Sequence, residues 1–237
     1  LRGVGKTYGA LLYCLQNHKQ FILMRRIQKQ IDMISNDEFS PFKPFLELGI
    51  ETTIKSIQQG LYGVYAPEME RPLGYMLALS TISNLRGFSL PDVQIMVYDE
   101  FIPEPHSRPI KEEGKAFLNA YETINRNREL QGKEPIQVLC LANSEDLANP
   151  LFIELQFVTV AEKMVRKNIN KLIIPERDTT LYILTNSRIS DAKRETALYK
   201  LAGDSSFSHM ALDNDFTQNR MVNICSEEIS RLLWPGL

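Results

Sequence analysis

Apolar residues recur along the chain in segments that alternate between helical and strand-like spacing. The first is an amphipathic helix after Thr7, because apolar side chains recur at i, i+3, i+4 and i+7 (Tyr8, Leu11, Leu12 and Leu15). A continuous apolar run at 21–24 comes next and predicts a buried strand that ends at Arg25 and Arg26. A helix followed by a buried strand is typical of an α/β fold.

The rest of the chain continues this alternation. A helix is predicted at 111–128, and further strands are predicted at the short apolar runs 93–98, 136–142, 171–174 and 180–184. Between 28 and 75 the pattern is mixed, with a helix expected near 28–36 and short strands around 52–57 and 60–65. The order favours an α/β fold with a mostly parallel sheet and helices on both faces. In such sheets ligands bind at the carboxyl ends of the strands.

The pattern changes after Ser190, and this change predicts a domain boundary. Residues 191–202 are expected to form one helix that ends at Gly203, and a short helix is expected near 227–233. We therefore expect one α/β domain at 1–188, followed by a small helical linker or lid region at 189–237.

Composition narrows the class of protein only slightly. Of the 237 residues, 43% are hydrophobic and 24% are charged, which suits a soluble globular domain, and no apolar run approaches the roughly 20 residues that cross a bilayer. Three scattered cysteines predict reduced, buried thiols. The net charge is −2, yet residues 163–200 contain nine Lys or Arg against four Asp or Glu. This stretch is either a solvated basic surface or a face that meets a phosphate backbone.

The first residues carry most of a phosphate-binding loop. Residues 2–7 read R-G-V-G-K-T, the end of G-x-x-x-x-G-K-[ST], whose first glycine and preceding strand would lie before Leu1. Backbone N–H groups of such a loop and the following helix N-terminus bind anions. Lys6 would reach the β- and γ-phosphates of ATP, and the Thr7 hydroxyl would bind Mg²⁺. The predicted nucleotide-binding residues are Arg2, Gly3, Val4, Gly5, Lys6, Thr7, Tyr8 and Asn143.

Two adjacent carboxylates, Asp99 and Glu100, follow the apolar strand at 93–98. A second Asp-Glu pair at 37–38 follows no strand, so only the later pair is expected at the phosphates. Asp99 would bind Mg²⁺ and Glu100 would act as the general base that polarises the attacking water. Because neighbouring residues of a regular strand point to opposite faces, the pair should lie at the irregular end of the strand.

Polar residues beyond these motifs complete the predicted site. If the helix at 111–128 persists to its end, Arg126 points away from its buried stripe and Arg128 points towards it. An outward arginine can reach a neighbouring subunit and neutralise charge in the transition state. Asn143 ends a strand, where it could orient water or simply start a turn, and Arg25 and Arg26 could meet the base or a neighbour. A guanine-binding Asn-Lys-x-Asp motif is missing at its nearest candidate, 170–173, which argues against a switch GTPase.

With these residues in place, the chain resembles the DNA-packaging (encapsidation) ATPases of small tailed phages of the phi-twenty-nine type, distant relatives of large terminases. The resemblance rests on the segments R-G-V-G-K-T at 2–7, V-Y-D-E-F-I at 97–102, N-R-N-R-E at 125–129, C-L-A-N-S at 140–144 and L-D-N-D-F at 212–216. It implies a P-loop fold of the additional-strand catalytic-glutamate class. It also implies that Lys6, Glu100 and Arg126 are catalytic, with Arg126 acting in trans, and that Thr7 and Asp99 hold the metal.

The resemblance further implies what such a protein assembles with. It points to a homo-oligomeric ring, expected to have five subunits, that uses ATP and Mg²⁺ to drive double-stranded viral DNA through the portal protein into an empty capsid. A packaging RNA is a further candidate partner, whereas a membrane is not. The expected location is the host cytoplasm, and transiently the portal vertex of the procapsid. Family members continue into a nuclease-like C-terminal domain, so 189–237 would be the linker or lid that leads to it.

Two alternatives remain open from the sequence. The first is another P-loop motor, of the terminase or helicase kind, that acts on a different polymer. The second is a nucleotide-dependent assembly module, in which ATP sets the geometry of a ring and no motor activity follows.

Overall fold

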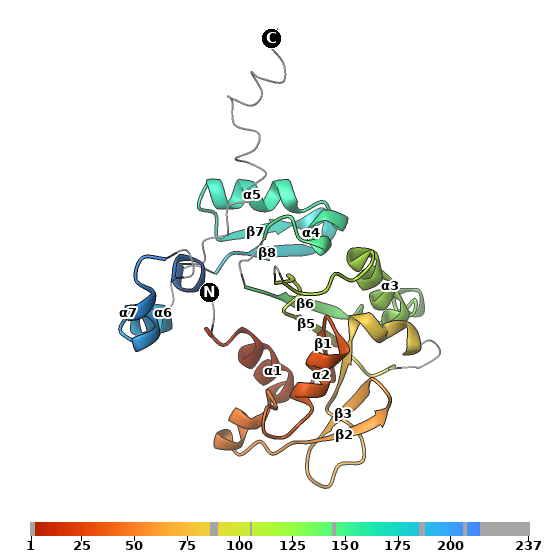
Figure 1. The fold of residues 1–237 in the computed structure, drawn as a ribbon. Helices are drawn as coiled ribbons and strands as arrows, with labels where there is room; N and C mark the ends of the chain where they lie inside the picture. The colour runs from red at the N-terminus through yellow and green to blue at the C-terminus, as the bar shows by residue number, and fades with distance from the viewer. Residues whose placement is uncertain are drawn as a thin grey trace. The chain divides into compact units, whose positions relative to one another are not determined.

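The structure is a computed structural model that describes residues 3–85, 90–104, 106–143, 146–184, 188–205 and 208–213 (Figure 1). Contacts divide the chain into two compact units. We call residues 5–101 and 108–142 the sheet unit, and residues 1–4, 102–107 and 143–237 the hairpin unit. The two units are described separately below.

A six-stranded sheet forms the centre of the sheet unit, in the order β2-β3-β4-β1-β5-β6. Its strands are β1 (Phe21–Arg25), β2 (Thr53–Gln58), β3 (Leu61–Tyr65), β4 (Gly74–Ala78), β5 (Ile95–Asp99) and β6 (Gln137–Leu141). β4, β1, β5 and β6 are parallel, whereas β2, β3 and β4 pair antiparallel. The predicted α/β fold with a mostly parallel sheet is confirmed.

Helices cover both faces of this sheet, as predicted. On one face, α1 (Lys6–Gln16) packs Leu11 and Cys14 into a cluster with Phe21 and Leu23 of β1 and Ile95 and Val97 of β5. On the other face, Tyr98 of β5 stacks on Phe117 of α3 (Glu113–Asn125), with ring centroids 5.2 Å apart. Strand side chains alternate between faces, and β1 and β5 are apolar on both faces up to their last residues, Arg25 and Asp99.

Shorter helices complete the sheet unit. They are α2 (Gln28–Ile34) and the 3₁₀ segments Lys43–Leu48, Leu79–Leu85 and Glu129–Gln131. α2 contacts β1 and β4, and the strand β4 was not among the predicted elements. It lies between β3 and β1 in the sheet, so it joins the antiparallel strands to the parallel ones.

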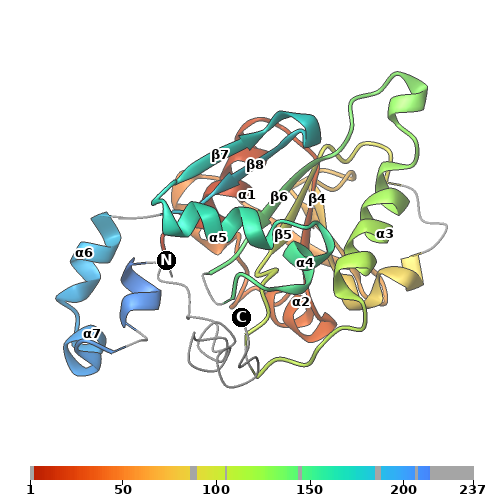
Figure 2. The same cartoon turned by 90° about the horizontal axis from the view of Figure 1, so that it is seen from above.

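The hairpin unit differs from the prediction. β7 (Lys171–Ile174) and β8 (Thr179–Tyr182) form a separate two-stranded antiparallel sheet, where we expected them to extend the parallel one. The physical reason is the connection: only residues 175–178 join the two strands, whereas a parallel crossover needs a dozen residues or more. α4 (Pro150–Glu154) precedes α5 (Val158–Arg166), which lies beside the hairpin in both views (Figures 1 and 2).

The helical end of the chain is also more divided than expected. The predicted helix at 191–202 is two helices, α6 (Arg188–Arg194) and α7 (Ala197–Ala202), and Gly203 with φ 54° follows the second. A short π-helical turn, His209–Asp213, comes last among the described residues. The helix expected near 227–233 lies outside them, and the predicted boundary at 188/189 stays a prediction.

Two further expectations meet the structure here. Cys14 is buried, as expected, but Cys140 is exposed because β6 is the outermost strand of the described sheet, and Cys225 lies outside the described residues. None of the helices in the described part of the chain has the length and apolar character to span a bilayer.

Candidate nucleotide-binding site

The glycine loop has the backbone that its sequence predicts. Gly3 and Gly5 have φ of 69° and 80°, in the left-handed region where a side chain is strained. Gly5 is the N-cap of α1 and provides no side-chain cap, and the N–H groups of a helix N-terminus favour an anion. Lys6 and Thr7 form the first turn of α1 and are both half-buried. Arg2 lies outside the described residues.

The neighbours of the loop are less specific. Val4 is half-buried, and Tyr8 is 37% exposed with its ring 4.8 Å from that of Phe45. Within the hairpin unit, the ammonium of Lys193 lies too close to where a β-carbon on Gly3 would be, so a methyl group there would require the lysine side chain to move. The predicted nucleotide contacts of Val4 and Tyr8 stay predictions.

The two acidic residues meet the loop at the end of β5. Thr7 Oγ1 donates a 2.7 Å hydrogen bond to Asp99 Oδ2. Asp99 is the last residue of β5, and Glu100 follows it with φ 54°, outside the regular strand. This change of backbone lets both carboxylates face the same group, the guanidinium of Arg25. The prediction that the pair lies at the irregular end of the strand is therefore confirmed.

Arg25 lies against the two carboxylates, and its suggested contact with the base or a neighbour stays a prediction. It ends β1, the strand next to β5, and its Nη2 lies 2.8 Å from Asp99 Oδ2 while its Nη1 contacts Glu100. The Arg25 side chain is 13% exposed, and its Nε has no partner among the described residues. Arg25 thus balances two carboxylates of the site.

The two carboxylates differ in their surroundings. Asp99 is 2% exposed, and this burial raises the pKa of its carboxyl group, although Arg25 and the Thr7 hydroxyl act in the opposite direction. The Glu100 side chain is 48% exposed and can meet solvent water. A buried carboxylate beside a hydroxyl and a half-exposed carboxylate next to it suit separate roles in binding and in proton transfer.

The donor set also fits a magnesium ion. Mg²⁺ prefers oxygen ligands and is usually held by one or two protein groups together with substrate phosphates. Thr7 and Asp99 offer a hydroxyl and a carboxylate oxygen 2.7 Å apart. Across the described ranges no group of three or more His, Cys, Asp or Glu could hold a metal on its own, so phosphate would have to complete such a site.

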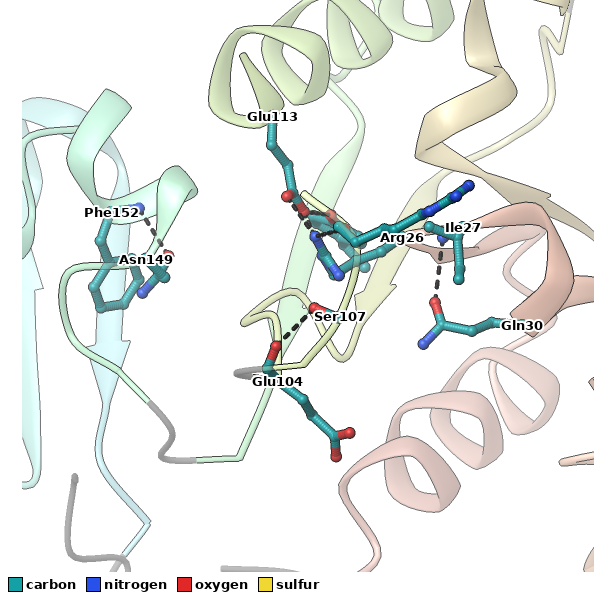
Figure 3. A network of polar contacts seen from close by, with 10 residues as sticks. Arg26, Ile27, Gln30, Glu104, Ser107, Glu113, Asn149 and Phe152 are labelled. Carbon is teal, nitrogen blue, oxygen red and sulfur yellow. Dashed lines mark hydrogen bonds and ion pairs between the residues drawn. The ribbon is translucent and has the colours of Figure 1, made fainter. Parts of the chain in front are cut away.

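Arg26, the residue after Arg25, forms a buried ion pair that the sequence did not predict (Figure 3). Arg26 donates from Nε and Nη2 to the two carboxylate oxygens of Glu113, at 2.6 and 2.7 Å, and Tyr98 Oη lies 3.1 Å from Glu113 Oε1. Burial lowers the pKa of Arg26, but the hydrogen bonds and charge of Glu113 outweigh this and raise it. Arg26 therefore holds the start of α3, and it is not a contact for the base or a neighbour.

We expected Arg126 to lie on the helix at 111–128, but it lies just after the helix ends. α3 ends at Asn125, and Arg126 is its C-cap with φ 45°. Arg126 is nonetheless exposed, with Nε 3.3 Å from the Thr123 carbonyl oxygen, whereas Arg128 is half-buried and donates to the Pro91 carbonyl. Arg126 is exposed and Arg128 is half-buried, as predicted. The turn after α3 causes this difference, whereas we expected it to come from their positions around a helix. Asn143 is half-buried after β6, in the hairpin unit, and its role stays a prediction.

Comparison with known proteins agrees with this arrangement. Residues 1–230 match the family described as Podovirus DNA encapsidation protein (Gp16). The DNA packaging protein of Bacillus phage phi29 is 27% identical over 228 residues, which cover 94% of this chain and 62% of that protein. The corresponding protein of Bacillus phage B103 is also 27% identical, with 94% and 64% covered. The chain thus spans a little under two thirds of these relatives.

Solved structures show the same fold. The N-terminal domain of the DNA packaging ATPase from bacteriophage phi29 superposes with a TM-score of 0.59 and 25% identity, covering 78% of this chain and 86% of that one. The Phi-28 gp11 DNA packaging motor gives a TM-score of 0.63 at 20% identity, over 92% and 64% of the two chains. The fold is that of P-loop packaging ATPase domains, and the chain belongs to the podovirus DNA encapsidation protein (Gp16) family.

Proposed function

We propose that this chain contains the ATPase of a motor that drives double-stranded viral DNA into an empty capsid. The observation that carries the proposal is the cluster of Thr7, Asp99 and Glu100, in which a glycine-loop hydroxyl and two carboxylates converge at the ends of neighbouring elements. Family membership and the similarity to a packaging ATPase domain support the same activity.

In this proposal the loop and the acidic pair divide the chemistry of ATP hydrolysis. Backbone N–H groups of 3–5 and the Lys6 ammonium would bind the phosphates, and Thr7 and Asp99 would hold Mg²⁺, which would neutralise phosphate charge. Water attacks the γ-phosphorus, Glu100 accepts a proton from it, and the bond from phosphorus to the β–γ bridging oxygen breaks to release ADP. Glu100 suits this role because its side chain is half-exposed, next to the buried Asp99.

Arg25 sets the resting state of the proposed site. Its guanidinium neutralises Asp99 and Glu100 together, a position that limits the freedom of the base. Glu100 would have to leave Arg25 to reach an attacking water, so this ion pair holds the proposed base back from proton transfer. Arg25 is therefore expected to lower turnover.

The proposed partners follow from the family. Arg126 would act in trans on the site of a neighbouring subunit, in a homo-oligomeric ring of five at the portal vertex of the procapsid. The relatives known as DNA packaging proteins and the packaging ATPase domain support DNA as the substrate to be moved. The expected location is the host cytoplasm, with a packaging RNA as a further candidate partner.

The test is steady-state ATP hydrolysis by the complete protein, with and without double-stranded DNA, compared with Glu100→Gln. We expect DNA to stimulate turnover, and we expect the variant to bind ATP but lose about 10²-fold or more of its turnover, the typical share of a general base. Stimulation by RNA and not by DNA would favour another P-loop motor. Rings that still form and package with the variant would contradict the motor and favour an assembly module.

A further inference from the structure

The turn that carries Arg126 has an unusual backbone. Arg126 and Asn127 have φ of 45° and 55°, so two successive non-glycine residues are in the left-handed region. Such residues are uncommon and cost free energy, and they persist only where surrounding contacts fix them. We therefore expect contacts with neighbouring residues to fix the backbone of this turn.

Asn125, the last residue of α3, makes the contacts that hold the turn. Its side chain is buried, with Nδ2 donating to Glu129 Oε2 at 2.7 Å and Oδ1 accepting from the Ile136 backbone N–H at 3.0 Å. Its own carbonyl accepts from the Arg128 N–H at 3.2 Å. One residue thus connects the end of α3, the far side of the turn and the residue that precedes β6.

The other side of the turn is fixed by Arg128. Its carbonyl accepts from the Lys133 N–H at 3.0 Å, and its guanidinium donates to the Pro91 carbonyl. Pro91 and Ile136 lie just ahead of β5 and β6, which pair from Ile95 and Gln137 onwards. The turn is therefore fastened to the strand that carries Asp99, while Arg126 between these anchors stays exposed.

We infer that Asn125 is a positioning residue for Arg126, which it presents from a rigid, left-handed turn to a site on a second copy of this chain. The inference rests on the proposed function, because it assumes that Arg126 acts in trans. A catalytic arginine needs a fixed direction, since a displacement of about 1 Å can cost about 10²-fold in rate. On a mobile turn, the backbone that carries the arginine would have to be ordered in every cycle. The contacts of Asn125 and Arg128, which we call the clamp, remove that need.

The experiment uses mixed assemblies of the complete protein. Asn125→Ala should lower DNA-stimulated turnover by about 10²-fold, with ATP binding unchanged. Mixing it with Glu100→Gln, which lacks the base but keeps Arg126, should restore several-fold of that loss. A mixture of Asn125→Ala with Arg126→Ala should restore none. Asn119→Ala is the matched control, because Asn119 is an exposed asparagine of the same helix, and it should behave as the unaltered protein.

The outcomes separate the inference from the proposed function. If Arg126→Ala lowers turnover and a folded Asn125→Ala does not, the positioning role is wrong and the trans arginine stands. The same conclusion follows if Glu100→Gln rescues Arg126→Ala but not Asn125→Ala, since the clamp would then serve its own subunit. If Arg126→Ala has no effect, both ideas fail.

A second pair of variants keeps the test valid if Asn125→Ala does not fold. Glu129 is exposed, so Glu129→Ala removes one of the two side-chain bonds without opening the core. Glu129→Ala should also lower turnover, by less than Asn125→Ala does. Mixing it with Glu100→Gln should restore activity. Glu129→Gln keeps an acceptor oxygen and should retain activity. Equal activity of the two variants would overturn the clamp.

Discussion

At the scale of single residues, the buried carboxyl group of Asp99 is costly to folding when it is ionised. Burial raises the pKa of its carboxyl group despite the help of Arg25 and Thr7, so the folded protein disfavours the charged form. Asp99→Asn removes that charge, keeps an oxygen for the Thr7 hydroxyl, and should therefore raise Tm. The measurement is thermal unfolding without nucleotide, and a lower Tm at neutral pH would contradict it.

The sign of the pH dependence gives this expectation a control. A carboxyl group with a raised folded pKa costs stability once it ionises, so the cost grows as pH rises from the ordinary pKa to the raised one, stays constant above it, and disappears as pH falls below the ordinary pKa. The Tm advantage of Asp99→Asn should therefore be largest at neutral pH and shrink in acid. If the Tm difference between Asp99→Asn and the unaltered protein does not depend on pH, its cause is packing and not the charge of Asp99.

At the scale of elements, the Arg26–Glu113 pair fastens α3 to β1 and β5. Because both side chains are almost fully buried, removing one leaves the other as an uncompensated charge. Arg26→Met should cost about 3–5 kcal/mol of unfolding free energy, whereas Arg26→Met with Glu113→Leu should cost much less. Urea denaturation of the two proteins measures the difference, and equal losses would show that the charge is not the cause.

The same scale shows how far the sequence predicts this fold. The buried runs at 21–24 and 95–98 are apolar on both faces, so their strands and the parallel sheet follow from pattern alone. Thr7, Asp99 and Glu100 also follow from pattern, since each lies at the end of such an element. The end of α3 does not, because it depends on Asn125 binding Glu129 and Ile136, and the grip of Arg25 depends on which strand lies next to β5. Such pairings between distant segments leave no periodic signal.

At the scale of the whole molecule, the net charge is −2, so the chain as a whole does not attract DNA. Any attraction to DNA must come from local basic surfaces. The basic excess at 163–200 begins on α5, where Lys163, Arg166 and Lys167 are exposed. Two of them lie in its last turn, where cations also stabilise a helix, so the surface has a structural explanation as well as a functional one. Salt dependence distinguishes these explanations, because each phosphate contact contributes about 0.9 to the slope of log affinity against log salt.

We therefore predict that the double variant Lys163→Glu with Lys167→Glu raises the DNA concentration needed for half-maximal ATPase stimulation. The slope of log affinity against log salt should become shallower by the contribution of about two phosphate contacts. Turnover without DNA should not change. The matched control is Lys29→Glu with Lys43→Glu, two exposed lysines of the sheet unit, which alters the net charge equally. If both double variants shift the curve alike, net charge is the cause. If neither does, α5 is a solvated basic surface, and the DNA contacts lie elsewhere in the complete protein.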